Sequence, residues 1–150
     1  MHITQRLLAI TLIALLTTAC ESPQSNDNSP ETTQSETAAS SEKLLQEAFK
    51  EQKYNLQVEG QGKVIKLLSD DLDGSKHQRF ILELSSGQTL LVAHNIDLAP
   101  RIKALQVGDM VTFYGEYEWN PEGGVIHWTH HDPAGEHVEG WLKHDGKLYQ

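Results

Sequence analysis

The chain has 150 residues, of which 38% are hydrophobic, and a formal net charge of −9. This length suits one domain with tails. The acidic charge argues against a general binder of nucleic acid or anionic membranes, because basic residues supply most of that affinity. A single cysteine excludes an internal disulfide and a cysteine-based zinc site. The eight histidines are about twice the usual share for a protein of this size.

The first 19 residues are typical of a secretory leader. His2 and Arg6 form a weakly basic start, and residues 7–16 are apolar apart from Thr11. This stretch is too short for the roughly 20 apolar residues that span a bilayer. The leader ends in Leu-Thr-Thr-Ala-Cys20, which resembles the lipobox of bacterial lipoproteins, although Thr17 stands where a leucine is usual. The resemblance implies that 1–19 is a lipoprotein signal peptide and that Cys20 is lipidated.

Residue Glu21 follows the cysteine. By resemblance to lipoprotein sorting rules, a residue other than aspartate at this position implies an outer-membrane anchor that faces the periplasm. The alternative is an ordinary signal peptide and a soluble periplasmic or secreted protein. Residues 20–40 are rich in Ser, Thr, Gln and Glu and lack large apolar side chains, which predicts a disordered tether. A single domain is then expected over 41–150.

Apolar spacing predicts a helix over 41–53, with Leu44, Leu45, Ala48 and Phe49 on one face. After it the apolar period becomes two, which indicates strands over 56–68, 77–84 and 89–94. In the second of these strands, Gln78 and Phe80 share one face, and His77 and Arg79 share the other.

A short helix is predicted over 97–105, where Asp97 can cap and Pro100 is tolerated in the first turn. Two more strands follow, over 110–119 and 125–130. Three strands, a helix and two strands are the order of an OB-fold, a small five-stranded Greek-key barrel. The sequence therefore predicts a mainly β, OB-like barrel with a short helix between its third and fourth strands, preceded by an N-terminal helix. The alternative is an open antiparallel sheet with the helix on one face.

Three segments of the chain stand out for their polar and aromatic residues, and each contains histidine: 77–80, 94–101 and 127–133. Together with 115–120 and Gly140-Trp141, they resemble a bacterial family catalogued as a domain of unknown function, number 3465, over roughly residues 56–150. The resemblance implies a compact exported domain and that these His, Arg, Asp and Trp segments are what the family shares. It brings no assigned activity.

The first functional hypothesis is a zinc-like divalent metal site, because histidine and aspartate side chains are metal ligands. On a straight strand His127 and His131 would be about 13 Å apart, too far to share an ion. The strand must therefore bend near Thr129, or the loop 131–137 must fold back. The alternative is that these histidines are hydrogen-bonded loop anchors. The candidate ligands are His127, His130, His131, Asp132 and His137.

The second hypothesis is a polar binding face on the barrel. If Val111, Phe113 and Tyr117 point inward, Glu116 and Glu118 lie outward with the face that carries His77. OB-folds commonly bind ligands on the outer face of strands two and three. The tryptophans offer stacking surfaces, although they can equally serve the core. The candidate ligand-binding residues are His77, Arg79, His94, Asn95, Glu116, Glu118 and Trp128.

The third hypothesis is metal-dependent, nuclease-like hydrolysis at the same patch. A cleft with several carboxylates and an arginine suits such chemistry, but the segment 70–74 also reads as a tight surface turn. No nucleophile elbow, phosphate loop or Cys–His pair is present. The residues concerned are Asp70, Asp71, Asp73, Arg79 and Glu83.

Taken together, the sequence favours a lipid-anchored periplasmic binding or envelope-accessory module rather than an enzyme. Its expected partners are the membrane, through the N-terminal lipid, and an envelope ligand or protein of unknown identity. Nucleic acid is not an expected partner. A metal-dependent hydrolase is the alternative.

Overall fold

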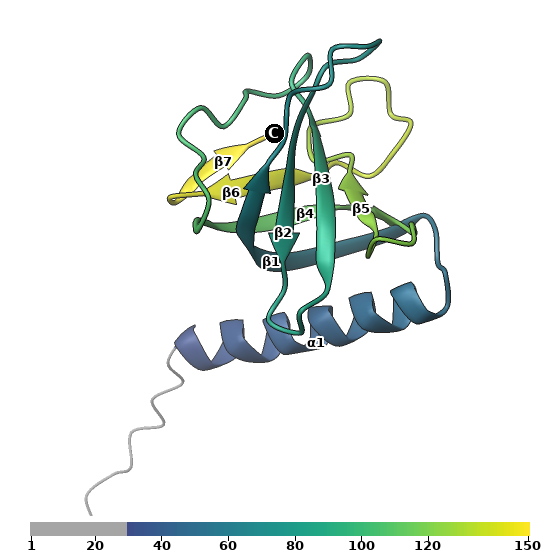
Figure 1. Cartoon of the computed structure of the whole chain (residues 1–150), viewed down its shortest axis with the longest axis vertical. Helices are drawn as coiled ribbons and strands as arrows, with labels where there is room; N and C mark the ends of the chain where they lie inside the picture. The colour runs from purple at the N-terminus through teal and green to yellow at the C-terminus, as the bar shows by residue number, and fades with distance from the viewer. Residues whose placement is uncertain (1–29) are drawn as a thin grey trace, which may run out of the picture.

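The computed structural model describes residues 30–150 (Figure 1). The expected signal peptide 1–19, Cys20 and the first part of the tether lie outside the described residues. The first described element is the helix α1, Pro30–Lys50. Within 30–150, no helix is long and apolar enough to cross a membrane.

Helix α1 begins earlier than the sequence predicted, so residues 30–40, which we expected in the tether, are helical. A proline is well suited to the first turn of a helix, where its missing N–H costs nothing. Extending a helix from a packed segment adds one hydrogen bond per ordered residue, without a new nucleation cost. The packed segment is the second half of α1, where Leu45 and Ala48 are fully buried.

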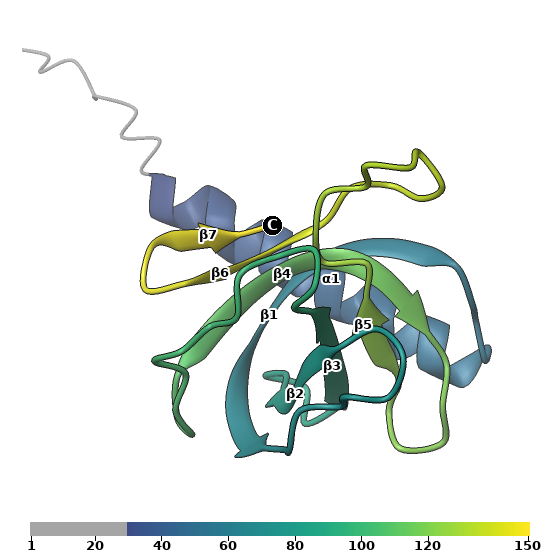
Figure 2. The same ribbon diagram turned by 90° about the horizontal axis from the view of Figure 1, so that it is seen from above.

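Seven strands form one sheet in the order β1-β2-β3-β5-β4-β6-β7, and β1 also pairs with β4. The additional pairing closes the first five strands into a barrel, seen from above in Figure 2. The strands are β1 Leu56–Leu67, β2 His77–Glu83, β3 Thr89–Asn95, β4 Met110–Glu118, β5 Val125–His127, β6 Trp141–His144 and β7 Lys147–Tyr149. The predicted OB-like barrel is confirmed.

One long strand and one parallel pairing close the barrel. The first half of β1 pairs with β4 and its end pairs with β2, with an irregularity between Val64 and Lys66. Strands β3 and β5 are the one parallel pair within residues 30–150, with Leu91 opposite Val125. Strand β4 therefore has three neighbours, because it pairs with β1, β5 and β6.

Side chains alternate along each barrel strand between a buried inner face and a partly exposed outer face. In β2, Gln78 and Phe80 point inward while His77 and Arg79 are half-buried, as predicted. In β4 the same alternation places Glu116 on the outer face. The fully buried apolar side chains inside the barrel are Val64, Phe80, Leu82, Leu90, Val92, Val111, Phe113, Tyr117, Ile126 and Leu142.

Helix α1 lies across the end of the barrel that carries the β2–β3 turn (Figure 1). Its Leu45 and Ala48 join the apolar core, and the Ser85 hydroxyl of the turn donates a hydrogen bond to Glu42. Gly60 makes room for the core next to this end, because a Cβ there would lie 2.5 Å from the ring of Phe113.

The predicted helix over 97–105 is wrong, because the β3–β4 connection consists of turns. Pro100 disfavours helical geometry in the residue before it. The backbone of Ile102 is bound instead by the buried side chain of Gln78. Its N–H donates to Gln78 Oε1 at 2.8 Å, and its carbonyl accepts from Gln78 Nε2 at 3.0 Å. One amide side chain thus supplies both hydrogen bonds that helical neighbours would have supplied.

The predicted strand 125–130 ends early, at His127. Trp128 has a φ of 51°, a left-handed conformation that a strand does not accommodate. The chain then forms a loop and returns as the hairpin β6–β7, which the sequence reading did not identify. This hairpin extends the sheet beyond β4, with Tyr114 opposite Trp141.

Replacing Gln78 with leucine should destabilise the fold. Leucine fills a similar volume but leaves the buried N–H of Ile102 without a partner and its carbonyl with only the long contact from Arg101 Nη1 at 3.5 Å. The expected cost is about 2–3 kcal/mol in the free energy of unfolding. Urea unfolding measures this cost. The exposed Gln61→Leu change is the control, and an equally small effect of both substitutions would contradict the assigned role of Gln78.

Candidate functional site

A shallow groove of about 380 Å³ runs across the outer face of β2, β3, β5 and β4. We call it the outer groove. Its floor is apolar, and its walls are polar and of both charges. It is lined by Asp71, His77, Arg79, Leu91, Ala93, Glu118, Val125 and His127.

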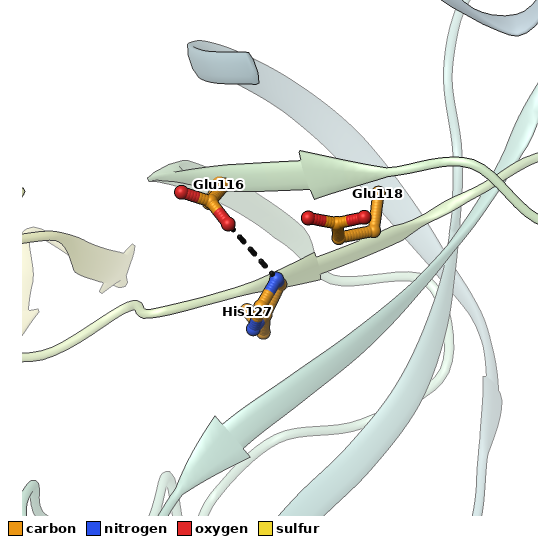
Figure 3. A group of neighbouring side chains, drawn as sticks. All are labelled: Glu116, Glu118 and His127. Atoms are coloured by element: carbon orange, nitrogen blue, oxygen red, sulfur yellow. Dashed lines mark ion pairs between the residues drawn. The ribbon is translucent and has the colours of Figure 1, made fainter. Parts of the chain in front are cut away.

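At one wall of the outer groove, Glu118 of β4 and His127 of β5 converge with the neighbouring Glu116 of β4. Their ligating atoms all lie within 4.8 Å of one another, and His127 Nε2 is 3.6 Å from Glu116 Oε1. Figure 3 shows both carboxylates reaching from β4 toward the imidazole. The convergence follows from the sheet register, in which Glu116 is directly opposite His127. We call these residues the Glu–Glu–His group.

The two carboxylates of this group lie close together, and the neighbouring histidine does not neutralise their charge. Burial raises the pKa of Glu116, and the neighbouring Glu118 carboxylate raises it further. Burial lowers the pKa of His127, so the imidazole is neutral at pH 7. Its Nε2 atom is buried and has no hydrogen-bond partner. Two adjacent carboxylates and a neutral imidazole with a free ring nitrogen are a donor set suited to a divalent cation.

The same strand register adds Gln57, which the sequence reading did not single out. Gln57 of β1 is directly opposite Glu116, and its Nε2 atom is buried without a partner. Only knowledge of the β1–β4 pairing could have found it, because alternation alone does not say which strands are neighbours.

The opposite wall of the outer groove carries His77 and Arg79, as the predicted binding face requires. The Arg79 Nε donates to the carbonyl of Ser69 at 3.1 Å, and its Nη1 lies 3.8 Å from an Asp71 carboxylate oxygen. On β3, Ala93 is directly opposite Arg79. Its small side chain leaves the space between the basic and the acidic walls open.

The carboxylates proposed for the nuclease-like hypothesis do not come together. Asp70 instead forms a two-fold hydrogen-bonded ion pair with Arg101, at 3.0 and 3.2 Å. Asp73 is exposed in its turn, and Glu83 lies exposed at the other end of β2. Of that set, only Asp71 and Arg79 line the outer groove.

Beside the Glu–Glu–His group, the loop 128–140 folds back on itself. Such folding was one of the two ways in which the histidines of 127–137 could come close enough to share a metal ion. The Gly140 N–H donates to the His130 carbonyl at 3.0 Å and closes the loop. Glycine is needed there, since a Cβ would lie 2.1 Å from the Trp128 carbonyl oxygen. The indole of Trp128 stacks on His137 with ring centres 4.1 Å apart, and its N–H lowers the pKa of Glu116 by hydrogen bonding.

The predicted metal ligands of this segment separate into three kinds. His127 belongs to the Glu–Glu–His group. His130, Asp132 and His137 turn into the interior of the loop, where Asp132 accepts the backbone N–H groups of Ala134 and His137. His131 is exposed and forms an ion pair with Glu139 at 3.2 Å, away from the others.

His94 and Asn95 of the predicted patch serve the fold. His94 is fully buried, with Nδ1 2.8 Å from the Thr129 hydroxyl and Nε2 3.3 Å from the Pro100 carbonyl. The neutral ring therefore donates to Pro100 and accepts from Thr129, which ties two loops to β3. The Asn95 side chain accepts the N–H of Asp97 and shapes the turn after β3.

The burial of His94 should make the fold acid-sensitive. Burial lowers its pKa from 6.5 to about 4, so the unfolded chain takes up this proton first as the pH falls. The contribution is complete above pH 6.5 and is lost progressively toward pH 4, where the free energy of unfolding is lower by about 3 kcal/mol. Urea unfolding over this pH range measures the loss.

The matched variants are His94→Gln and the exposed His131→Gln. Removing His94 should reduce the pH dependence, leaving the smaller contributions of groups such as His127, whose pKa burial also lowers, while His131→Gln should retain the full slope. If both variants keep the slope of the unchanged protein, another group is responsible.

Comparison with known proteins places the chain in a family. A search of curated proteins found no significant match. Residues 30–150, which include both the barrel and α1, match the family described as "Protein of unknown function (DUF3465)". The match extends the resemblance noted from residue 56 onward to the N-terminal helix. The chain therefore belongs to the DUF3465 family.

Proposed function

We propose that this protein is a binding module of the bacterial envelope and that its outer groove binds a divalent transition-metal ion at the Glu–Glu–His group. The observation that carries the proposal is the convergence of three ligating side chains within 4.8 Å. Ligands around a tetrahedral zinc ion are roughly 3.3 Å apart. Small side-chain rotations therefore suffice to bring the three groups onto one ion.

The chemistry of the group favours a cation over other ligands. A dication would neutralise the two carboxylates whose proximity raises the pKa of Glu116. It would also give the unpartnered Nε2 of His127 a bond. A nitrogen ligand and an apolar floor suit zinc or a similar ion better than calcium, which takes six to eight oxygen ligands. Three protein ligands leave a coordination position open toward the groove.

Binding of Zn²⁺, measured by titration calorimetry, tests the proposal. The Glu116→Gln/Glu118→Gln double variant should weaken one bound equivalent by at least about tenfold, because it removes both charged ligands. The exposed Glu122→Gln change, which removes one carboxylate from a turn outside the group, should bind zinc as the unchanged protein does. Equal zinc binding by all three proteins would refute the metal site.

A metal-dependent hydrolase is the second candidate, and the position of Arg79 favours it. Arg79 lies across Ala93 from the Glu–Glu–His group, where a guanidinium can hold an anionic substrate against a metal ion. Zinc-loaded protein that cleaves a model phosphodiester, and loses this with Arg79→Gln, would favour the enzyme. Binding of zinc without turnover favours the binding module.

The anchor belongs to the same proposal. The sequence up to Cys20 supports lipidation and attachment to the outer membrane, with the domain in the periplasm. We expect the protein to partition with outer-membrane vesicles and to become soluble on Cys20→Ser, because the change removes the acylated thiol. Membrane partitioning of the Cys20→Ser protein would contradict the lipid anchor, and fractionation of cells measures it.

A further inference from the structure

The loop 130–140 has an inside-out arrangement of side chains. Its valine, Val138, is 55% exposed, and Pro133 and Ala134 are exposed as well. Its interior is made instead by His130, which is 1% exposed, and by the side chains of His137 and Asp132, which are 8% and 5% exposed. A loop that buries two imidazoles and a carboxylate while it exposes its apolar residues gains nothing from the hydrophobic effect.

Both buried imidazoles are fixed in the same tautomer. His130 Nδ1 donates to the carbonyl of His131, and His137 Nδ1 donates to the carbonyl of Val138 at 2.8 Å. Each ring therefore presents Nε2 as a lone pair. A donor bond from Nδ1 to a backbone carbonyl is the usual second contact of a metal-bound histidine, because it orients the ring and raises its basicity.

The Nε2 atoms of the two rings lie in the loop interior, where the side chains are almost fully buried. His130 Nε2 is buried without a hydrogen-bond partner, and its ring meets that of His137 edge-on with centres 5.0 Å apart. His137 Nε2 is 3.9 Å from Asp132 Oδ1. This carboxylate already accepts backbone N–H groups, which hold it in place and leave further lone pairs for a metal.

We propose that His130, His137 and Asp132 form a second transition-metal site inside the loop 130–140, distinct from the Glu–Glu–His group. Two imidazoles and one carboxylate select zinc or copper over magnesium and calcium. These residues are distinct from the Glu–Glu–His group, which among the described residues is the one set whose ligating atoms all lie within 4.8 Å of one another. The three loop side chains would therefore have to move closer together to share an ion. A metal bound there would fix His137, and through the stacked Trp128 it would stiffen the wall of the outer groove.

The experiment isolates the loop by removing the other site. The purified protein carries Cys20→Ser, so that the thiol contributes no ligand, together with Glu116→Gln/Glu118→Gln. Glutamine at 116 still accepts the Trp128 N–H. Titration with Cu²⁺ should show one remaining equivalent, and electron paramagnetic resonance of that equivalent should show two imidazole nitrogens.

Adding His137→Gln should weaken this equivalent by at least about tenfold, while the adjacent, exposed His131→Gln should leave it unchanged. Absence of copper binding in the isolating background would overturn the loop site and leave the Glu–Glu–His site standing. If the protein binds the same number of copper equivalents with and without the two glutamates, the Glu–Glu–His site is refuted and the loop site is not. A spectrum with fewer than two imidazoles, or equal loss with His131→Gln, would also overturn the loop site, and the spectrum does not depend on whether the His137 variant folds.

Discussion

The three-sided pairing of β4 is the constraint on which the rest of the structure depends. β4 hydrogen-bonds to β1, β5 and β6, and the parallel contact of β5 with β3 completes the ring. Any slip of one residue would turn every side chain of β4 to the other face. The burial of Phe113 and Tyr117 inside the barrel therefore fixes Glu116 and Glu118 on the outside, with Glu116 opposite His127.

The connections between strands are held by buried polar side chains. Gln78 binds the backbone of Ile102, His94 binds Pro100 and Thr129, and His144 binds Asp109 at 2.8 Å. Gln78 and His94 thereby supply partners to the loop backbone groups of Ile102 and Pro100, whereas His144 joins β6 to the side chain of Asp109. Gln78 and His94, which pair at the end of β2 and β3 away from their turn, hold the irregular chain that covers this end of the barrel. The buried histidines account for part of the histidine excess.

Three further histidines, His127, His130 and His137, lie beside carboxylates in the two candidate metal sites. The Glu–Glu–His group combines a raised Glu116 pKa with an unpartnered His127 nitrogen. The loop beside it buries His130 and His137, with Trp128 stacked between the two regions. Polar groups left unsatisfied at burial are costly, and a bound cation would remove that cost in both places. The common physical requirement supports treating the two regions as neighbouring sites.

Local alternation was enough to predict much of the fold. The inward and outward faces of β2 and β4 follow from the period of two, so His77, Arg79, Glu116 and Glu118 were placed on the outer face from the sequence. The order of the strands indicated the OB-like barrel. The helix predicted over 97–105 failed because a distant side chain, Gln78, binds the backbone of Ile102, and such long-range competition leaves no trace in local periodicity.

Within the candidate sites, the sequence determined which chemical groups are available, and only the tertiary structure decided which of them meet. The histidines of 127–137 look alike in the sequence. The register of β4 against β5 brings His127 to Glu116, the left-handed turn at Trp128 sends His130 inward, and His131 is left in solvent. The physical reason is that residue type sets the donor atoms, whereas burial and contact depend on strand register and loop closure between residues far apart in the chain.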